Sequence, residues 1–478
     1  MTHARATSNA VRMLKQDELV FRTALELGSL IRRKQVSPVQ ITRAFLERID
    51  ALNPKLNAFI TIVHDRALEQ ARKAEAEIQK GRYLGPLHGI PYAAKDCFAT
   101  KGILTTNGSR LYEKWIPDLE STATQRLSDA GAILLGKLNL WELASAGFAF
   151  EAVRNPWGLD YAAGGSSSGS GAALAARMVP LALGTDTGGS VRMPAALCGI
   201  TGLRPTYGRV SLHGIIVNTW SVDTAGPMST NVEDTALMLR AIAGADRNDR
   251  KSSNEAVPDF VRESQSGIRG LRVGIPNKYF FDVEPALESA VRSALDVLQK
   301  LGATAVDVDI PHAEHASTVR NILFAESACY HEKRLRDQGE LFGPAARERL
   351  EVAKYFTATD YIKAQRLRTV LMQEVDDVFK QCDVFIVPTL ENTASLLSEG
   401  LSASSHSSRT LNAGGTFVSS VTGVPSLAVP CGFSTSPKLP FSLLMHARPF
   451  QESVAFRIGC AYQSVTDWHK DVPAVARA

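Results

Sequence analysis

The spacing of hydrophobic residues predicts two helices near the start of the chain. Ile41, Phe45 and Ile49 recur at the helical period. Directly before them, the segment 37–40 (SPVQ) supplies an N-cap serine, a proline at the first helical position and a capping-box glutamine. We expect this helix to end at Asn53-Pro54, because proline cannot continue the hydrogen-bond ladder. A second helix, rich in Ala, Glu and Lys, is expected over 64–80.

From residue 85 onward, short apolar runs broken by glycine replace the helical pattern. These runs predict buried strands at 132–135, 181–183, 271–275, 305–310, 384–387 and 427–429, with helices at 172–177 and 287–301. Strands that alternate with helices are typical of α/β proteins. We therefore predict a single large domain around a central mixed, mostly parallel twisted sheet, covered by helices on both faces.

Three parts are expected within this domain. They are an N-terminal helical part (about 18–80), a catalytic core (about 85–230), and a C-terminal half (about 265–470) that adds strands and pocket walls. The polar segment 246–253 is expected to link the two halves, and the serine-rich segment 395–408 to form a flap over the pocket.

Charge and composition narrow the choice of partners. The net charge is only +4 and no basic stripe is interleaved with aromatics, so we expect no nucleic-acid partner. No run of 18 apolar residues occurs, so no membrane partner is expected. Six scattered cysteines favour a reducing cytoplasm. Since HExxH and paired CxxC are absent, we expect neither a metal nor another cofactor.

Two segments rich in glycine and serine lie between apolar ones. The segment 164–171 (GGSSSGSG) runs directly into an alanine-rich helix, unlike a flexible linker in polar surroundings. In 185–192 (TDTGGSVR) a buried strand ends, two glycines turn the chain and a serine follows. Such a turn exposes successive backbone N–H groups beside a hydroxyl, which is what acyl transfer needs.

A serine nucleophile also needs a base to take its proton. The usual base is histidine, but none of the ten histidines stands in a context that suggests catalysis; His88, His312 and His315 fit structural or surface roles. Lys95, at the end of the apolar run 91–94, is the remaining candidate. On this segment alone, a surface lysine with a buried stem fits equally well.

Taken together, these segments resemble the amidase-signature family. The segment 85–91 (GPLHGIP) followed by Lys95-Asp96 resembles its lysine motif, and the segments 164–167 (GGSS) and 186–190 (DTGGS) resemble its serine motifs. The two serines, Ser166 and Ser190, stand 24 positions apart, as in the family. Three motifs in the right order make the resemblance specific. It extends from about residue 25 to 210 and more loosely to the C-terminus.

The resemblance implies a role for each matching residue. Ser190 matches the acyl-forming nucleophile, Ser166 the bridging serine on a cis peptide bond, and Lys95 the base. The family's oxyanion hole corresponds to the backbone N–H groups of Thr187, Gly188, Gly189 and Ser190. Holding a lysine neutral at pH 7 requires about 4–5 kcal/mol, which burial and hydrogen bonds can supply.

The substrate pocket is expected to be apolar, with walls from Trp141, Phe148, Phe150, Met193 and Tyr330. The stretch between Lys137 and Gly164 is shorter than in the glutaminase subunit of tRNA-dependent amidotransferases, and the region around 412–414 lacks the acid that grips glutamine there. We therefore expect a stand-alone amidase, a monomer or homodimer, that hydrolyses small hydrophobic or aryl amides, and carbamates (urethanes) or esters as well. Its only partner would be this small-molecule substrate.

Two alternatives stay open. One is a glutaminase-type subunit of an amidotransferase complex. The other is an α/β-hydrolase-like esterase, because 165–169 (GSSSG) satisfies the GxSxG nucleophile elbow with Ser167 at its centre. The elbow requires a strand directly before it, and 160–163 (DYAA) is a poor strand. Phosphate binding is disfavoured, since neither GxxxxGK[ST] nor GxGxxG opens the following helix.

Overall fold

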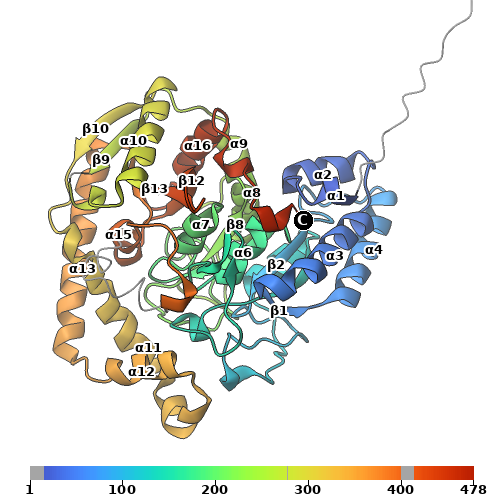
Figure 1. The fold of residues 1–478 in the computed structure, drawn as a ribbon, viewed down its shortest axis with the longest axis horizontal. Coiled ribbons are helices and arrows are strands. Elements are labelled where there is room, and N and C mark those ends of the chain that lie inside the picture. The colour runs from blue at the N-terminus through green and yellow to red at the C-terminus, as the bar shows by residue number, and fades with distance from the viewer. Residues whose placement is uncertain (1–15, 277, 400–413, 478) are drawn as a thin grey trace, which may run out of the picture.

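A computed structural model describes residues 16–276, 278–399 and 414–477, and a sheet of eleven strands runs through it (Figure 1). The strands are β1 (Phe59–Ile62), β2 (Pro91–Lys95), β3 (Ile133–Leu138), β6 (Leu181–Asp186), β7 (Thr201–Arg204), β8 (Thr224–Ser229), β9 (Arg272–Pro276), β10 (Thr304–Val308), β11 (Val384–Pro388), β12 (Ser426–Phe433) and β13 (Pro440–Ala447). Their order is β1-β3-β2-β6-β8-β7-β12-β13-β11-β9-β10. A separate pair is formed by β4 (Arg154–Asn155) and β5 (Gly158–Ala162).

The sheet is mixed, as expected, but antiparallel pairing predominates in it. Of its ten strand pairs, β2–β3, β2–β6, β9–β10 and β9–β11 are parallel, and the other six are antiparallel. The expectation of a mostly parallel sheet is wrong because the sequence did not reveal β7, β8 and β13. Each of their pairings is antiparallel, and β8 (TAGPMS) carries no apolar run that would mark it as a strand.

Helices flank this sheet and complete a single large α/β domain. They are α1 (Gln16–Leu19), α2 (Ala24–Arg32), α3 (Pro38–Leu56), α4 (His64–Gln79), α5 (Thr122–Asp129), α6 (Ser168–Ala175), α7 (Arg192–Cys198), α8 (Val232–Ile242), α9 (Phe260–Ser264), α10 (Pro285–Lys300), α11 (Val319–Asp337), α12 (Pro344–Ala353), α13 (Ala358–Gln381), α15 (Gly414–Thr422) and α16 (Glu452–Gln463). On the sheet, α6 packs with α7, α13 packs with α15, and α16 packs with both α8 and α10. The largest buried hydrophobic cluster draws on all three expected parts of the chain.

Local sequence signals account for the first helices. Ser37 caps α3, and its capping box with Gln40 forms as expected. The helix does not end at Pro54 but continues to Leu56, and Asn57 terminates it in the left-handed conformation. Pro54 lies in the last turn, where its missing N–H removes one hydrogen bond and the helix ends two residues later. The expected helix over 64–80 is confirmed as α4.

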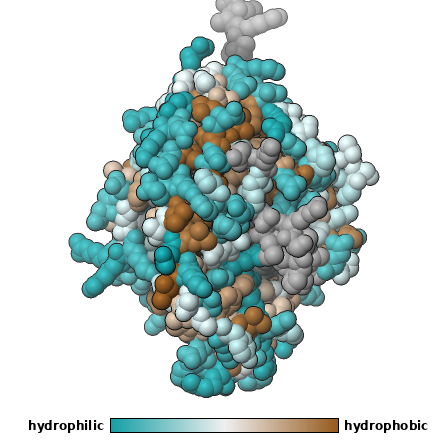
Figure 2. Space-filling model, turned by 90° about the vertical axis from the view of Figure 1, so that its left-hand side faces the viewer, coloured by the Kyte–Doolittle hydropathy of each residue, from teal (hydrophilic) through white to brown (hydrophobic). Residues whose placement is uncertain are grey.

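The surface alternates between hydrophilic and hydrophobic side chains. Figure 2 shows this on the side that carries α13, where hydrophobic residues form separate islands among hydrophilic ones. The exposed apolar residues of α13 are Ile362, Val370 and Met372. Within the ranges described, no helix combines the length and the apolar character needed to cross a membrane.

Candidate active site

Lys95 lies at the carboxyl end of β2, a strand whose five residues are all buried. Parallel neighbours β3 and β6 flank this strand on either side. The Lys95 Nζ atom donates to the Ser166 hydroxyl at 2.7 Å and to the Thr185 hydroxyl at 2.7 Å. Burial lowers the pKa of Lys95 to about 8. A buried amine between two hydroxyls is placed to exchange a proton with them, which excludes a surface role for this lysine.

Ser166 stands just before α6, at a cis peptide bond to Gly165, as the resemblance implied. A Cβ atom on Gly165 would lie 1.9 Å from the Trp141 ring, so only glycine fits there. The backbone N–H of Trp141 donates to the Ser166 carbonyl at 3.1 Å. The Ser166 side chain is fully buried and faces Lys95, whereas the indole of Trp141 packs on the backbone before it.

Ser190 follows β6 on a turn that is held by the carboxylate of Asp186. The Gly189 N–H donates to Asp186 Oδ1 at 3.0 Å, and the Val191 N–H donates to its Oδ2 at 3.0 Å. Gly189 has a φ of +129°, in the region that favours glycine. The Ser167 N–H donates to the Ser190 carbonyl at 3.1 Å and thereby holds the two serine loops together. Ser190 is partly exposed, whereas Ser166 and Lys95 are buried.

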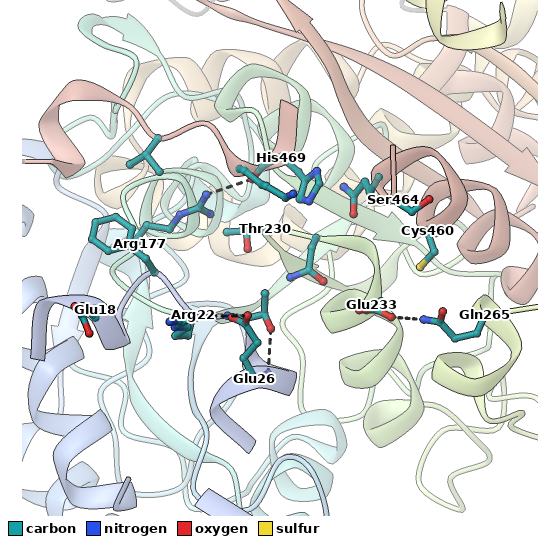
Figure 3. Close-up of a pocket in the computed structure, with 16 residues that line it drawn as sticks. Glu18, Arg22, Glu26, Arg177, Thr230, Glu233, Gln265, Cys460, Ser464 and His469 are labelled. Atoms are coloured by element: carbon teal, nitrogen blue, oxygen red, sulfur yellow. Dashed lines mark hydrogen bonds and ion pairs between the residues drawn. The ribbon is translucent and has the colours of Figure 1, made fainter. Parts of the chain in front are cut away.

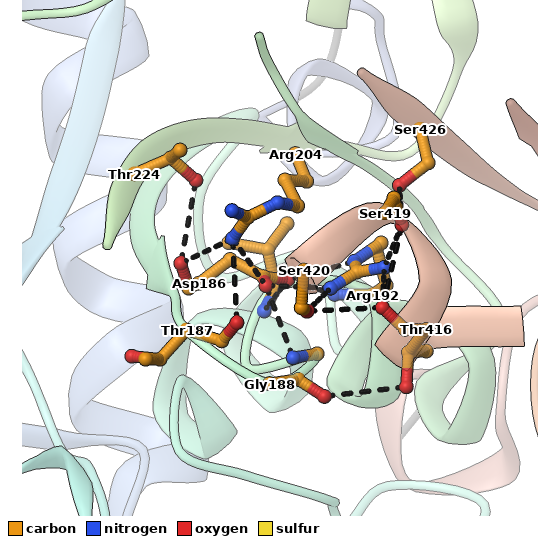
Figure 4. Close-up of polar contacts among 12 residues, drawn as sticks. Asp186, Thr187, Gly188, Arg192, Arg204, Thr224, Thr416, Ser419, Ser420 and Ser426 are labelled. Carbon is orange, nitrogen blue, oxygen red and sulfur yellow. Dashed lines mark hydrogen bonds and ion pairs between the residues drawn. The ribbon is translucent and has the colours of Figure 1, made fainter. Parts of the chain in front are cut away.

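The same carboxylate forms a buried ion cluster with two arginines (Figure 4). Asp186 accepts from Arg192 at 2.7 Å and from Arg204 at 3.1 Å, and all three side chains are fully buried. Burial alone would raise the pKa of Asp186, but the two positive charges hold it well below its usual range. Arg192 also donates to Ser419 and Ser420 of α15 at 2.6 and 2.9 Å, which ties the serine loop to the C-terminal half.

A second buried carboxylate supports Thr187. The Thr187 hydroxyl donates to Asp223 at 2.6 Å, and the backbone N–H groups of Asn218 and Thr219 donate to the other oxygen of Asp223 at 2.6 and 2.9 Å. Burial raises the pKa of Asp223 to about 6. Neither Asp223 nor Thr185 was foreseen from the sequence, because both are polar residues without a motif of their own. The only sequence signal for them is that Thr185 lies at the end of a strand and Asp223 just before one.

Ser167, the centre of the possible nucleophile elbow, is engaged elsewhere. Its hydroxyl donates to the Thr185 carbonyl at 3.2 Å and accepts from the Thr185 N–H at 3.3 Å. The side chain is fully buried. The strand before it, β5, pairs with β4 outside the main sheet, so the strand–turn–helix context of the elbow is absent here.

The expected pocket residues divide into two groups. Trp141 and Met193 reach the serine loops, since a Cβ on Gly189 would lie 3.0 Å from Met193 Cγ. Phe148 packs against the large core and Phe150 is exposed. The Tyr330 ring meets the His331 ring edge to face, with their centroids 4.9 Å apart. Of the expected flap, the Ser395 carbonyl accepts from the Ala162 N–H at 2.9 Å, while its residues 400–408 lie outside the described ranges.

A small cavity adjoins the serine loop and contains an arginine that the sequence analysis missed. It is lined by Ser145, Asn218, Leu323, Phe324, Ser327, Arg349, Leu350 and Ala353. A Cβ on Gly188 would lie 3.7 Å from Leu323, which places this cavity beside the expected oxyanion donors. Arg349 donates to the Ser145 carbonyl at 2.5 Å and stacks on Phe324, and no carboxylate of the described residues lies within ion-pair distance of it. Burial lowers the pKa of Arg349 to about 10, so it stays charged at pH 7. The cavity holds only about 10 Å³, so neighbouring side chains must move before a carboxylate can enter it.

Comparisons with known proteins place this chain in a family. The family model described as "Amidase" matches residues 40–455. A glutamyl-tRNA(Gln) amidotransferase subunit from Chloroflexus aggregans is 39% identical over 490 residues, which cover 96% of this chain and 100% of that protein. A solved structure of the same kind of subunit, from Thermotoga maritima, is 30% identical, covers 98% of this chain and 99% of that one, and has a TM-score of 0.77. A structure from a vestigial protein complex, described as revealing the evolutionary origins of an s-triazine catabolic enzyme, is 32% identical with a TM-score of 0.87 and covers 93% and 98%.

These relatives overturn two expectations. A stand-alone hydrolase of small hydrophobic or aryl amides is contradicted, since full-length relatives at this identity are amidotransferase subunits, and carbamate or urethane cleavage gains no support. A small-molecule partner without nucleic acid is contradicted on the same ground, because those relatives belong to a complex named for a tRNA. The expectation rested on two local features, the short stretch between Lys137 and Gly164 and the missing acid near 412–414, whereas the relatives match over nearly the whole chain. Positions 412 and 413 lie outside the described ranges. The match over residues 40–455 and the full-length likeness together show that the chain belongs to the amidase family, the amidase-signature enzymes that act on C–N bonds.

Proposed function

We propose that this chain is the glutamine-hydrolysing subunit of an amidotransferase complex. The observation that carries the proposal is its likeness, over nearly its whole length, to glutamyl-tRNA(Gln) amidotransferase subunits. In this role, water and the side-chain amide of glutamine would give glutamate and ammonia, and a partner subunit would use the ammonia to amidate glutamyl-tRNA(Gln).

Ser190 is the proposed nucleophile, since it is the partly exposed serine of the two facing loops. Its hydroxyl attacks the amide carbon and passes its proton through Ser166 to Lys95, which is buried at 2.7 Å from Ser166. Lys95 then returns the proton to the leaving nitrogen, ammonia departs, and water hydrolyses the acyl-enzyme in the same way. With a pKa of about 8, Lys95 is partly neutral at pH 7 and can act in both directions.

The oxyanion is proposed to bind to backbone N–H groups of the turn 187–190. Among these, the Gly189 N–H already donates to Asp186 at 3.0 Å. We therefore assign the oxyanion to the N–H groups of Thr187, Gly188 and Ser190. The Asp186 cluster and the bond from Thr187 to Asp223 hold this turn in place before substrate binds.

Arg349 is proposed to bind the α-carboxylate of glutamine. It lines the cavity beside Gly188, and its charge lacks a carboxylate partner among the described residues. A planar guanidinium matches a carboxylate with two parallel hydrogen bonds. Glutamine would be recognised by this charge at one end and attacked at the other.

The test compares substrates on the chain alone and on the chain co-expressed with its partner subunits. We expect the highest kcat/KM for free glutamine, rising when the partners are present. An anilide hydrolysed better than glutamine under both conditions would contradict the proposal.

A variant pair tests the recognition step separately. Arg349→Gln should raise the KM for glutamine about tenfold or more, because a charged hydrogen bond is lost, and leave kcat/KM for an uncharged anilide nearly unchanged. Arg347→Gln is the matched control, since Arg347 lies on the same helix but pairs with Glu351 on the surface. Equal effects of the two variants on glutamine would exclude Arg349 as the carboxylate ligand.

A further inference from the structure

A second cavity lies between the N-terminal helices and the C-terminal segment (Figure 3). Its volume is about 740 Å³, within the range of small-molecule sites. It is lined by residues of α1, α2, α8 and α16, by the segments 21–23, 230–231 and 464–472, by Gln265 after α9 (Phe260–Ser264), and by Arg177 behind α6. Nothing in the proposed glutamine hydrolysis uses these residues.

Arg177 stands out among the residues that line this cavity. Its side chain is 8% exposed, and its contacts are two long hydrogen bonds from one nitrogen, to the carbonyls of His469 and Asp471 at 3.3 and 3.4 Å. In the part of the chain that the structure describes, no carboxylate pairs with it. Burial, together with the nearby charge of Arg48, lowers the pKa of Arg177 to about 10, so it stays charged at pH 7. A buried charge without a counter-charge is unfavourable, and an anion in the cavity would relieve it.

The backbone at this position also points to a role for the side chain. Arg177 has a φ of +58° and directly follows the C-cap of α6, where glycine is the usual residue. Its N–H donates to the Leu174 carbonyl and the Met178 N–H to the Ala173 carbonyl, which closes the helix as glycine would. An arginine is thus held where local conformation favours glycine.

The other charged residues that line the cavity favour a ligand with one anionic group rather than a polyanion. Arg22 and Lys470 are exposed and pair with Glu26 at 3.5 Å and with Asp467 at 2.7 Å, weak surface contacts that can rearrange toward a ligand. The His469 Nδ1 atom is buried and has no hydrogen-bond partner among the described residues. Three glutamates also line the cavity, namely Glu18, Glu26 and Glu233, so its total charge is balanced. Figure 3 shows Arg177 and His469 on the other side of the cavity from Glu233 and Gln265.

We propose that this cavity is a binding site for a small anion, a ligand whose phosphate or carboxylate group is held by Arg177. Its oxygens accept from the guanidinium N–H groups that do not reach the protein carbonyls, and from His469 when Nδ1 carries the proton. The site is separate from the catalytic serines: α6, eight residues and about 12 Å long, leads from Ser166 to Arg177.

The test is isothermal titration calorimetry of the full chain with inorganic phosphate and with acetate, each against sodium chloride of the same ionic strength. We expect saturable one-to-one binding of at least one probe, and the better probe identifies the anionic group. Arg177→Gln should weaken that binding about tenfold or more, because a charged hydrogen-bond donor is lost. Arg177→Gly should weaken it equally while keeping the fold, since glycine suits the left-handed position.

Arg457→Gln is the matched control. Arg457 also donates to a backbone carbonyl, that of Gly267, but lies outside the cavity, so binding should stay as in the wild type. Absence of saturable binding of both probes to the wild type would overturn the proposal. Binding that both Arg177 variants retain at full strength would overturn it as well. Glutamine hydrolysis by the Arg177→Gly variant is measured in parallel, so that loss of the anion site is distinguished from failure of the catalytic assignment.

Discussion

The rate of acylation should depend on pH through the titration of Lys95. In the proposed mechanism the neutral amine accepts the proton from Ser190 through Ser166, so the rate should rise as pH increases through the pKa of Lys95. With that pKa at about 8, about 10% of the enzyme has a neutral lysine at pH 7, about half at pH 8 and about 90% at pH 9. The expected gain is therefore about fivefold from pH 7 to 8 and less than twofold from pH 8 to 9.

The assay follows labelling by a fluorophosphonate rather than hydrolysis of glutamine, because the α-amino group of glutamine itself titrates in this range. The second-order rate constant of labelling is measured between pH 6 and 10 for the wild type and for Lys95→Ala. The variant should lose about 10²–10⁴-fold in rate and the titration near pH 8. A wild-type midpoint between 6 and 7, as for a histidine base, or a profile that is the same in both proteins, would refute the assignment of Lys95.

Further substitutions test the supports of the site. Asp186→Asn leaves two buried guanidinium groups without their carboxylate and should lower the free energy of unfolding by about 3–5 kcal/mol in a denaturant titration. Asp383 pairs with Arg272 nearer the surface, so Asp383→Asn should change the free energy of unfolding by about 1 kcal/mol or less. Fluorophosphonate should label Ser167→Ala at the wild-type rate and leave Ser190→Ala unlabelled; the opposite result would restore the nucleophile elbow. Gly165→Ala would place a methyl group 1.9 Å from an indole ring, so it should abolish labelling, and a fully active variant would contradict the packing of this loop.

Much of the site was visible in the sequence because its signals are local. The segments 164–171 and 185–192 place glycine and serine between buried elements, and the strand before Lys95 is a continuous apolar run. The structure brings these segments together through parallel pairing of β2 with β6 and through the bond from the Ser167 N–H to the Ser190 carbonyl. Short-range patterns predict such elements well, since strand burial and turn chemistry depend on neighbouring residues.

The parts that the sequence did not reveal depend on contacts between distant segments. Asp223 lies 36 positions from Thr187, and Arg349 lies 204 positions from the Ser145 carbonyl that it contacts, so no spacing links them. The antiparallel strands β7 (TGLR) and β8 (TAGPMS) lack the apolar run on which strand prediction relies. The expectation about substrate class rested on local features as well, namely the length of the stretch between Lys137 and Gly164 and a missing acid near 412–414.

The most direct test of the proposed function is to trap the acyl-enzyme with glutamine itself. The chain, assembled with its partner subunits, is mixed with glutamine, quenched in acid within milliseconds to seconds, digested and mapped by mass spectrometry. We predict a γ-glutamyl ester on the peptide that carries Ser190, present in the wild type and absent from Ser190→Ala. A glutamyl group on Ser167, or no adduct from glutamine under conditions where an anilide acylates Ser190, would contradict the account.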